Sequence, residues 1–501
     1  MRGIFTPITH IRRQVFTEIA KVAWEERDPR EVDDIPYKVI SGEVPNYRGS
    51  IFHERAIVAA RTRLGLGLDR KLNVDNGRLS KVIDEAVVTH SIIKEPLVNV
   101  IPFACASCES SKHFVTDNCR KCIAHPCMIV CPVNAISIGK DRAIIDKEKC
   151  IDCGKCAKAC QYHAIMKLER PCKVACGVDA IESDELGRAK INYDKCVSCG
   201  MCIVNCPFAA ITDKSDIFQL VLAIKQGEEV HAIIAPSFVG QFGPFATPGK
   251  IVRAAKDLGF TEIIEVALGA DAAARHEAEM FPQLVPDKQP FLGTSCCPSW
   301  TMTAKKFFPD LYKYISSSNT PMVETAKAIK KRSPSGKIVF IGPCISKKIE
   351  AMDEEVRPYI DFVITYEELA AIFVAANIDV AEIKEDEIVA DASTKGRNFA
   401  FASGVASSVK SSIEQAHPGL EIPVHNANGL SDCRKMLAMA KAGKFNGYLL
   451  EGMACPGGCV GGPGTMLPIE KGEKEAKEFA KKSPYSDVFQ NPFFEEDNEE
   501  K

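Results

Sequence analysis

The sequence contains no long hydrophobic run. No apolar stretch approaches the roughly 18 consecutive residues that a transmembrane helix requires, so we expect no association with a membrane. The first 28 residues mix arginines with acidic residues, and they lack both the apolar block and the small-residue cleavage site of a secretory signal. We therefore expect a cytoplasmic protein.

A strong charge of one sign is also absent. The formal net charge is -3, and the 63 Lys and Arg residues are interspersed with 66 Asp and Glu residues. A protein that binds DNA or RNA usually concentrates basic residues in one region, so we expect no nucleic-acid partner. At 501 residues the chain is too long for a single core and predicts about three domains.

Cysteine is the abundant residue, with 22 in the chain. A reducing cytoplasm disfavours disulfides, so thiolate ligands to metal are the better interpretation. Sixteen cysteines lie between Cys105 and Cys206 and six lie between Cys296 and Cys459, whereas residues 1–100 contain none. The two cysteine-containing parts therefore require separate explanations.

The chain divides by composition into four parts. Residues 1–100 include stretches such as residues 80–95, with apolar residues at helical spacing, and predict a helical region. Residues 101–212 have too little apolar bulk for an ordinary core, so metal must hold them together. From residue 216 to residue 480, strand-like runs alternate with helical patterns: VHAIIAPS, EIIEVAL, KIVFIGPC, DFVITYEEL, NFAFASG and GYLLEGM. Residues 481–501 predict an acidic, frayed tail. The expected fold class is α+β and α/β, in several domains.

An internal repeat appears in the cysteine-rich part. The phrases CPVNAI, CQYHAI, CGVDAI and CPFAAI each follow a cysteine run and predict four ferredoxin half-units. Two runs have the spacing C-x2-C-x2-C-x3-C of bacterial ferredoxins, in which three thiolates bind one 4Fe-4S cluster and the fourth binds its neighbour. These are Cys150, Cys153, Cys156 and Cys160, and Cys196, Cys199, Cys202 and Cys206. A structural zinc site would rarely need sixteen cysteines in four related repeats.

The remaining cysteines of this part complete the set in more than one way. Cys119, Cys122, Cys127 and Cys131 form a third run with a wider gap, and Cys172 and Cys176 resemble the end of a fourth run. Cys105 and Cys108 either supply the two cysteines that the fourth run lacks or are plain buried thiols. If adjacent half-units pair, the groups are Cys119, Cys122, Cys127 with Cys160; Cys150, Cys153, Cys156 with Cys131; Cys196, Cys199, Cys202 with Cys176; and Cys105, Cys108, Cys172 with Cys206. The second and fourth runs could instead pair with each other. Three to four clusters are expected.

Three further cysteine motifs follow: TSCCPSW at 294–300, GPCISKK at 342–348 and EGMACPGGCVGG at 451–462. Together they resemble the three cluster-binding motifs of iron-only (FeFe) hydrogenases, and the resemblance covers roughly residues 100–465. It implies a two-lobed α/β domain and a catalytic 4Fe-4S cluster held by Cys297, Cys344, Cys455 and Cys459, with Cys459 bridging to a diiron subsite. That subsite would carry CO, cyanide and a dithiolate amine ligand, none of them made by side chains.

The resemblance also implies the residues around the diiron subsite. Lys347 and Ser237 would donate hydrogen bonds to the two cyanides, while Ala235, Pro236 and Met453 would line the pocket. Cys296, beside a ligand cysteine but free of iron, would relay protons, followed by Glu277 and Ser316. Trp300 and Cys433 are expected to be buried without a catalytic role.

Several positions depart from the family pattern. Gly342 stands where many members have methionine, Met322 stands where many have glutamine, and Met280 occupies the position of the outer relay glutamate. The third motif also continues as GGPGT. These changes, with the extra ferredoxin repeat, resemble a less-studied monomeric subgroup from anaerobes.

The expected function is reversible interconversion of protons, electrons and H2. The expected partners are a ferredoxin or similar small electron carrier and the maturation proteins that build the diiron subsite. Two alternatives remain: a hydrogen sensor with the same cofactor, although no sensory or kinase-like domain is evident, and an iron-sulfur assembly relative without the diiron subsite. Such a relative would not need Cys296, Lys347 and Met453 together.

Overall fold

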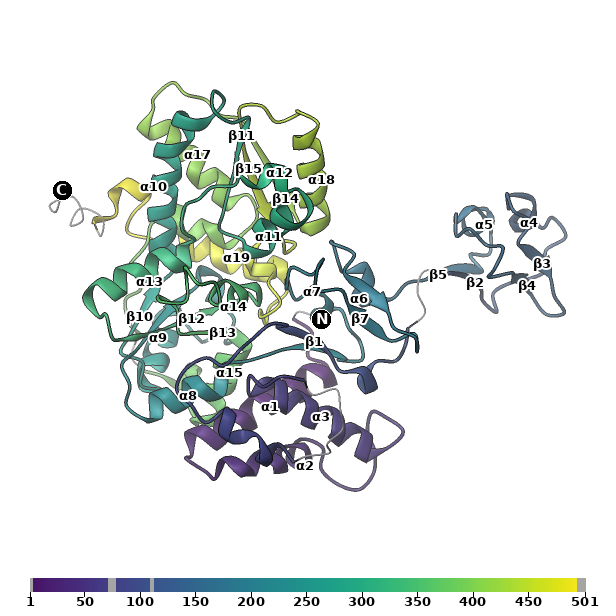
Figure 1. Ribbon diagram of the computed structural model, residues 1–501, viewed down its shortest axis with the longest axis horizontal. Helices are drawn as coiled ribbons and strands as arrows, with labels where there is room; N and C mark the ends of the chain where they lie inside the picture. Colours follow the sequence, from purple (N-terminus) through teal and green to yellow (C-terminus); the bar gives the residue numbers. More distant parts are fainter. Residues whose placement is uncertain (1–2, 71–77, 109–111, 385, 493–501) are drawn as a thin grey trace.

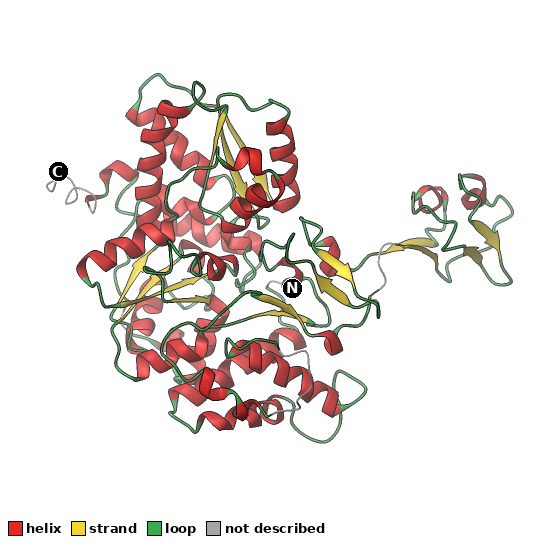
Figure 2. Cartoon of the chain, in the orientation of Figure 1, coloured by secondary structure: helices red, strands yellow, loops and turns green. Residues whose placement is uncertain are grey.

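The computed structural model describes residues 3–70, 78–108, 112–384 and 386–492. A large body contains the helical N-terminal region and two α/β lobes, and a small module extends from it on two strands (Figure 1). Helices and strands are mixed throughout the body (Figure 2), which confirms the expected multidomain α+β and α/β class. In the described part of the chain, no helix is both long enough and apolar enough to cross a membrane.

The N-terminal region is helical, as predicted. Its helices are α1 (Pro7–Trp24), α2 (Ile35–Val39) and α3 (Ile51–Gly65). Helix α1 begins with a proline at its first position, and the Thr6 side chain accepts a hydrogen bond from the backbone N–H of Thr9 at 3.3 Å. The buried face of α1, which includes Phe16 and Ile19, packs against α8 (Ile217–Lys225) and α15 (Tyr366–Ala375). The region is therefore part of the body.

The prediction of helix for residues 80–95 was wrong. This stretch forms two short 3-10 turns, Leu79–Lys81 and Ile83–Glu85, and then runs without regular structure to β1 (Val98–Val100). Tertiary contacts override the helical spacing here, because Ile83 and Ala86 are buried against the core that surrounds α1. The spacing of the apolar residues in this stretch therefore reflects which side chains are buried, and it does not indicate a helix.

The cysteine-rich part forms two modules. The distal module contains the antiparallel pairs β2 (Lys112–Val115) with β5 (Ile165–Leu168) and β3 (Ile136–Ile138) with β4 (Ala143–Ile145), and helices α4 (Pro126–Ile129) and α5 (Lys155–Ala159). The proximal module contains β6 (Ile181–Ser183) paired with β7 (Ala189–Ile191), and α6 (Pro171–Val174) with α7 (Met201–Val204). Strand β8 (Ile211–Asp213) pairs with β1, so the expected boundary near residue 100 falls inside a sheet.

Two parallel sheets form the lobes of the remaining domain. The first has the order β10 (Glu262–Glu265), β9 (Val230–Ile234), β12 (Lys337–Gly342) and β13 (Phe362–Thr365). The second has the order β11 (Phe291–Gly293), β15 (Tyr448–Met453) and β14 (Val424–Asn428). Strands β9, β12 and β13 of the first sheet are almost completely buried and rich in Val and Ile, as parallel strands covered by helices are, whereas the edge strand β10 is partly buried.

Helices cover and connect the two sheets. Helix α10 (Ala267–Leu284) contacts both α13 (Pro321–Arg332) and α17 (Gly404–Ala416), and so joins the lobes. The other helices of this domain are α9 (Pro248–Asp257), α11 (Pro298–Phe307), α12 (Pro309–Tyr312), α14 (Ser346–Glu350), α16 (Thr394–Arg397), α18 (Leu430–Lys441) and α19 (Ile469–Ala480).

The domain does not end at residue 480 as expected. Residues 481–492 pack against α10: Val488 is fully buried, and the Arg275 side chain donates a hydrogen bond to the Val488 carbonyl at 3.0 Å. The Asn491 side chain donates to a carboxylate oxygen of Asp271 at 2.9 Å. The acidic end of the predicted tail, residues 493–501, lies outside the described residues.

Candidate metal centre

A cavity of about 80 Å³ lies where the carboxyl ends of strands from both lobes meet. Strands β9 and β12 of one sheet, and β11 and β15 of the other, each lead into a loop that lines it. Ligands of open parallel sheets bind at this end of the strands. Residues from the sequence motifs that line the cavity are Ala235, Pro236, Cys296, Cys297, Cys344, Lys347, Met453, Cys455 and Cys459.

Local backbone geometry brings the last two cysteines of the set to the same cavity. Gly457 and Gly458, between Cys455 and Cys459, have φ angles of +84° and +83°, which a side chain would strain. A Cβ atom at Gly458 would also lie 2.5 Å from the backbone nitrogen of Ala402. The CPGGC sequence therefore turns the chain back so that both thiols line the cavity.

The four expected ligand thiols form a donor set that needs a cation. Burial, with the nearby Cys344 and Cys297, raises the pKa of Cys459 to about 12, against the opposing effect of Lys347. Burial and Cys344 likewise raise the pKa of Cys297 to about 11. Metal binding converts such buried thiols into thiolates, and soft sulfur donors suit iron-sulfur clusters. The residues present thus fit a catalytic 4Fe-4S cluster.

The two lysines of GPCISKK point to different partners. Lys347 lines the cavity, and its ammonium group lies 2.6 Å from a Glu350 oxygen and donates to the Thr320 hydroxyl at 3.0 Å. Lys348 is buried, and its ammonium group lies 3.0 Å from carboxylate oxygens of both Asp213 and Glu368. Sequence reasoning assigned a role to Lys347 only.

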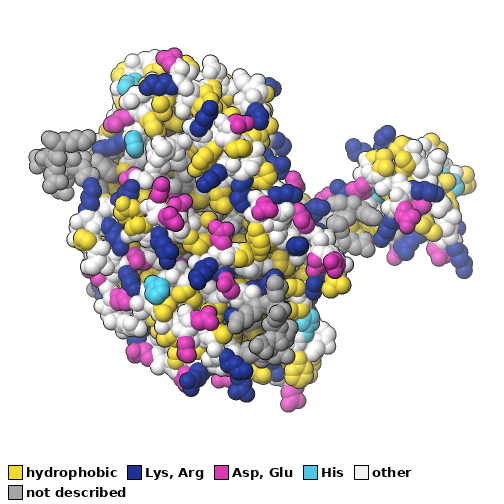
Figure 3. Space-filling view, in the orientation of Figure 1, with side chains coloured by type: hydrophobic (Ala, Val, Ile, Leu, Met, Phe, Trp, Pro, Cys, Tyr) yellow, Lys and Arg dark blue, Asp and Glu magenta, His cyan; other side chains and the backbone are white. Residues whose placement is uncertain are grey.

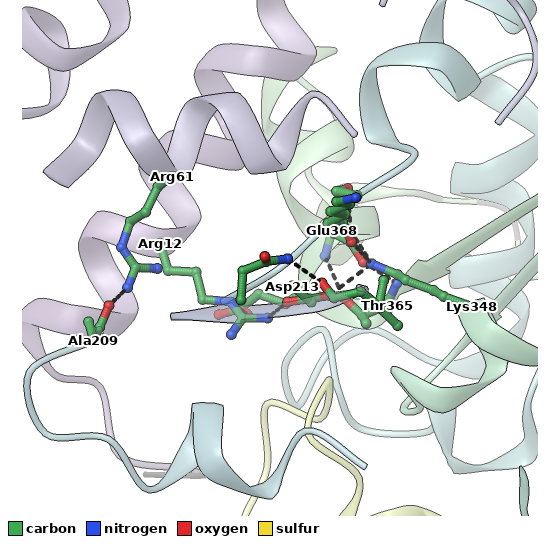
Figure 4. Close-up of polar contacts among 12 residues, drawn as sticks. Arg12, Arg61, Ala209, Asp213, Lys348, Thr365 and Glu368 are labelled. Atoms are coloured by element: carbon green, nitrogen blue, oxygen red, sulfur yellow. Dashed lines mark hydrogen bonds and ion pairs between the residues drawn. The ribbon is translucent and has the colours of Figure 1, made fainter. Parts of the chain in front are cut away.

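Lys348 belongs to an ion network at the junction of three regions (Figure 4). Asp213 lies on β8 of the proximal module, and Glu368 lies in the first turn of α15. Arg12 of α1 lies 2.7 Å from Glu367 and 3.5 Å from Asp213. The network therefore connects the N-terminal region, strand β8 and the α/β domain, and removing one partner would leave an uncompensated buried charge.

Ser237 does not line the cavity. Its hydroxyl lies 2.8 Å from the hydroxyl of Tyr366, which donates its single proton to the carbonyl of Ala235 at 2.9 Å. The proton of Ser237 is therefore donated to Tyr366. In this arrangement the Ser237 hydroxyl has no proton left for a ligand in the cavity, although Ala235 and Pro236 do line it.

Of the positions that depart from the family pattern, one lines the cavity and another lies next to a residue that lines it. Met322 lines it directly, together with Phe340. A Cβ atom at Gly342 would lie 2.5 Å from the Phe340 ring, so the ring fills the space that a larger residue at 342 would need. Met280 is partly buried against the apolar core next to α10 and offers no titratable group.

The residues predicted to relay protons lie in one neighbourhood. Cys296 lines the cavity, and burial followed by Cys297 raises its pKa well above the usual value, so the thiol keeps its proton. Glu277 on α10 is buried, and burial with the nearby Glu451 raises its pKa to about 7, although the neighbouring Ser316 side chain opposes the shift. Glu277 is also one of the groups that raise the pKa of Cys296, so the two side chains lie close to each other.

Two residues in this neighbourhood were not foreseen. The Ser316 hydroxyl donates to the hydroxyl of buried Ser318 at 3.0 Å, and Ser318 belongs to no motif. Glu451 opens the third cysteine motif, and its oxygens accept the backbone N–H groups of Ser403 and Ala406 at 2.7 Å. Glu451 thus caps the start of α17, which is a structural role. Trp300 and Cys433 are fully buried, as expected.

The structure brings adjacent half-units of the cysteine-rich part together. In the distal module, Cys131, Cys150, Cys153 and Cys156 line one small cavity of about 20 Å³. Burial raises the pKa of Cys127, and the thiols of Cys160 and Cys122 act in the same direction. Helices α4 and α5 pack against each other, so the first and second runs share one module.

The proximal module has the same arrangement. Burial and the thiols of Cys206, Cys105 and Cys108 raise the pKa of Cys172, to about 11, against the opposing effect of Arg170. Cys199 lies next to Cys176 and Cys196, and with burial these thiols raise its pKa to about 12. Cys202 is buried next to Cys199, Cys196 and Cys176, so fifteen of the sixteen cysteines fall into four groups of neighbours. Cys119 packs against the core of the distal module that also contains Cys127 and Cys160. Among the described residues, no three His, Cys, Asp or Glu side chains converge on a single-ion site.

Comparison with known proteins identifies two parts of the chain. Residues 228–463 match the family described as iron only hydrogenase large subunit, C-terminal domain, and residues 149–210 match the 4Fe-4S dicluster domain. The chain is 32% identical over 376 residues to Iron hydrogenase 1 of Clostridium pasteurianum, which covers 64% of each chain. It is 27% identical over 394 residues to the NADP-reducing hydrogenase subunit HndD of Solidesulfovibrio fructosivorans, covering 66% of this chain and 65% of that one.

A shorter match has a different description. A stretch of 95 residues, 19% of this chain and 20% of the relative, is 33% identical to the cytosolic Fe-S cluster assembly factor NAR1 of Kluyveromyces lactis. The matches to the two hydrogenases span just under two thirds of those proteins' own length.

The fold and the cysteine groups define an iron-sulfur protein that has two ferredoxin-like modules and a thiol-lined cavity between two α/β lobes. Residues 228–463, just under half of the chain, are similar to the C-terminal domain of iron-only hydrogenase large subunits.

Proposed function

We propose that this chain is an iron-only hydrogenase that interconverts protons, electrons and H2. The observation that carries the proposal is the cavity at the strand ends, where four thiols meet Cys296, Lys347 and Met453. Cys297, Cys344, Cys455 and Cys459 would hold the catalytic 4Fe-4S cluster, with the diiron subsite on Cys459. When bound, this cofactor supplies the redox chemistry that makes and breaks the H–H bond.

The residues around the cavity have three tasks. Lys347 offers a buried cation to the anionic cyanides, and Ala235, Pro236 and Met453 exclude water. Cys296, protonated and next to the cavity, passes protons toward Glu277 and Ser316. A Glu277 pKa of about 7 suits a relay, because such a group both accepts and releases protons near neutral pH. Ser237 could serve a cyanide only if its hydroxyl turned away from Tyr366.

The four groups of neighbouring cysteines would each hold one 4Fe-4S cluster of an electron wire. The proposed ligand groups are Cys119, Cys122, Cys127 and Cys160; Cys131, Cys150, Cys153 and Cys156; Cys176, Cys196, Cys199 and Cys202; and Cys105, Cys108, Cys172 and Cys206. The small cavity in the distal module and the mutual effects of the thiols on their pKa values support this partition.

The distal module fits an acidic electron carrier of ferredoxin type. Residues 113–168 contain nine Lys and Arg against five Asp and Glu, although the whole chain is slightly acidic. Dark-blue basic side chains are prominent on this module in Figure 3. Ile123 and Ile129 of the same module are 98% and 79% exposed. Exposed apolar side chains on a charged module are typical of a transient docking surface. Cysteine usage favours a reducing, cytoplasmic compartment for this exchange.

The two alternative functions predict different behaviour of the protein after maturation by its assembly proteins. A hydrogenase should evolve H2 from a reduced carrier and oxidise H2 in reverse. A sensor would hold the same cofactor with very slow turnover, and an assembly factor would retain clusters without turnover. Normal cluster content without H2 turnover in either direction would therefore contradict the proposal.

Iron content tests the wire directly. Protein reconstituted anaerobically without the diiron subsite should bind about twenty iron atoms, because five clusters hold four each. Replacing Cys105 and Cys108 by serine should lower the count by about four, whereas Cys433→Ala should leave it unchanged. A stable count near twelve in the parent protein would contradict a wire of four clusters.

A further inference from the structure

The same backbone turn follows the last cysteine of each of the four runs. In each turn, which we call a cysteine turn, the N–H of the fourth residue after the cysteine donates to its sulfur. The donors are Ala135 to Cys131 at 3.2 Å, Ala164 to Cys160 at 3.4 Å, Ala180 to Cys176 at 3.2 Å and Ala210 to Cys206 at 3.3 Å. The four turns share this geometry, so a difference in one of them can be recognised by comparison with the other three.

The fourth cysteine turn differs at its third residue. That residue has a positive φ in every turn: Asn134 50°, His163 48°, Asp179 53° and Ala209 52°. Asn, Asp and His are enriched in this left-handed region, whereas alanine is not. Ala209 must therefore be held in place by other parts of the protein.

Two arginines of the N-terminal helical region bind this turn. Arg61 of α3 donates to the carbonyl of Ala209 (Figure 4), and Arg48 donates to the carbonyls of Phe208 and Ala104, each at 3.0 Å. An arginine also contacts the Cys176 turn: Arg434 donates to the carbonyl of its first residue, Gly177, at 3.2 Å and to the Asp179 carboxylate at 2.9 Å. The Cys206 turn differs in the carbonyl that is bound, because Arg61 donates to that of the third residue, whose peptide carries the N–H that donates to sulfur.

These contacts act on sulfur through shared peptide units. The carbonyl of Ala209 and the N–H of Ala210 belong to one peptide, so a cation on the carbonyl polarises the N–H that donates to Cys206. The carbonyl of Ala104 shares its peptide with the N–H of Cys105. Arg61 is only 6% exposed, so its charge is weakly screened. Burial and Arg12 lower its pKa to about 10, which leaves it charged at neutral pH.

We propose that Arg48 and Arg61 raise the reduction potential of the cluster at Cys105, Cys108, Cys172 and Cys206 above those of the other wire clusters, so that it holds an electron between carrier and cavity. This inference rests on the proposed function. One-electron reduction adds a negative charge to the cluster, and hydrogen bonds to its sulfurs and nearby cations stabilise that charge. Buried Arg170, which donates to the Cys108 carbonyl at 2.7 Å, acts in the same direction.

The test is a redox titration of the reconstituted full chain, with the reduced clusters followed by electron paramagnetic resonance. Arg61→Met should lower the reduced-to-oxidised ratio of one cluster about tenfold at fixed potential, which is about 59 mV for a one-electron couple. The matched control is Arg55→Met. Arg55 lies on the same helix and donates to the carbonyls of Ile40 and Gly42 at 3.0 and 2.6 Å, outside any cysteine turn, so all potentials should stay at parental values.

Two further variants separate charge from structure. Arg61→Lys should keep most of the parental potential because it keeps the cation, and Arg48→Met should lower the same midpoint as Arg61→Met. Unchanged midpoints in Arg61→Met and Arg48→Met would overturn the inference. So would loss of the cluster in Arg61→Met if Arg48→Met kept the parental midpoint, because the role would then be structural. A parent protein with no reducible cluster would instead contradict the proposed function.

Discussion

Replacing Cys459 by alanine is expected to abolish H2 turnover, and Cys344→Ala is expected to do the same. Each change removes a soft thiolate from its own loop at the cavity, and the non-ligand thiol Cys296 comes from another loop, beside the ligand Cys297. The measurement is H2 evolution from a reduced carrier by matured protein, combined with infrared spectroscopy of the cofactor. Neither signal should survive.

Cys433→Ala is the matched control for these variants. Cys433 is a fully buried thiol whose S–H donates to the Met453 carbonyl at 3.6 Å, but it does not line the cavity. Its removal should keep the cofactor and most of the activity. Normal turnover and a full infrared pattern in Cys344→Ala or Cys459→Ala would reject the ligand assignment.

Cys296→Ala should slow proton exchange by roughly 100-fold or more, the usual scale of a general acid-base group, while the cofactor stays in place. The thiol lies at the cavity beside the ligand Cys297, so alanine removes the relay without removing a ligand. Cys296→Asp should recover part of the rate because a carboxylate also carries protons, whereas Cys296→Ser should recover little because a hydroxyl is far less acidic. Hydrogen–deuterium exchange with H2 and the infrared spectrum measure the two effects separately.

The expected order of rates is cysteine, aspartate, then serine and alanine. A Cys296→Ala protein that turns over H2 at the parental rate with an intact cofactor would show that protons take another route. Glu277 and Ser316 would then lose their proposed roles as well, because in this proposal they receive protons from Cys296.

The cysteine groups could be predicted because their signals are short in sequence. Spacings such as CPGGC and C-x2-C-x2-C-x3-C predict that thiols a few residues apart in the sequence lie close together in space. The pairing between runs could not be chosen from spacing alone, since adjacent or alternate half-units use the same cysteines. Contacts of α4 with α5 and of α6 with α7 favour adjacent pairing.

Strands were predicted well where they are apolar. The runs at β9, β10, β12, β13 and β15 form strands as expected. The run NFAFASG does not: residues Asn398–Ala400 form a 3-10 turn, because Phe399 and Ala400 are buried there without a neighbouring strand. Strand β14 was missed because its sequence, VHNAN, is mostly polar, and β11 was missed because it has only three residues.

The contacts that join distant regions had no signal in the sequence. Lys347 and Lys348 are adjacent, yet one lines the cavity and the other binds Asp213, 135 residues away. The bond between Ser237 and Tyr366 joins residues 129 positions apart and removes the expected donor from the cavity. Such pairings depend on how the modules and lobes pack, which local spacing does not encode.

Infrared spectroscopy of the matured protein tests the central claim most directly. Carbonyl and cyanide ligands absorb in a region where protein does not, and only the proposed diiron subsite would bring them to this chain. We expect bands from both ligands in the parent protein, and their loss in Cys459→Ala but not in Cys433→Ala. A fully matured protein with its 4Fe-4S clusters in place but without carbonyl or cyanide bands would contradict the proposal that this chain is a hydrogenase.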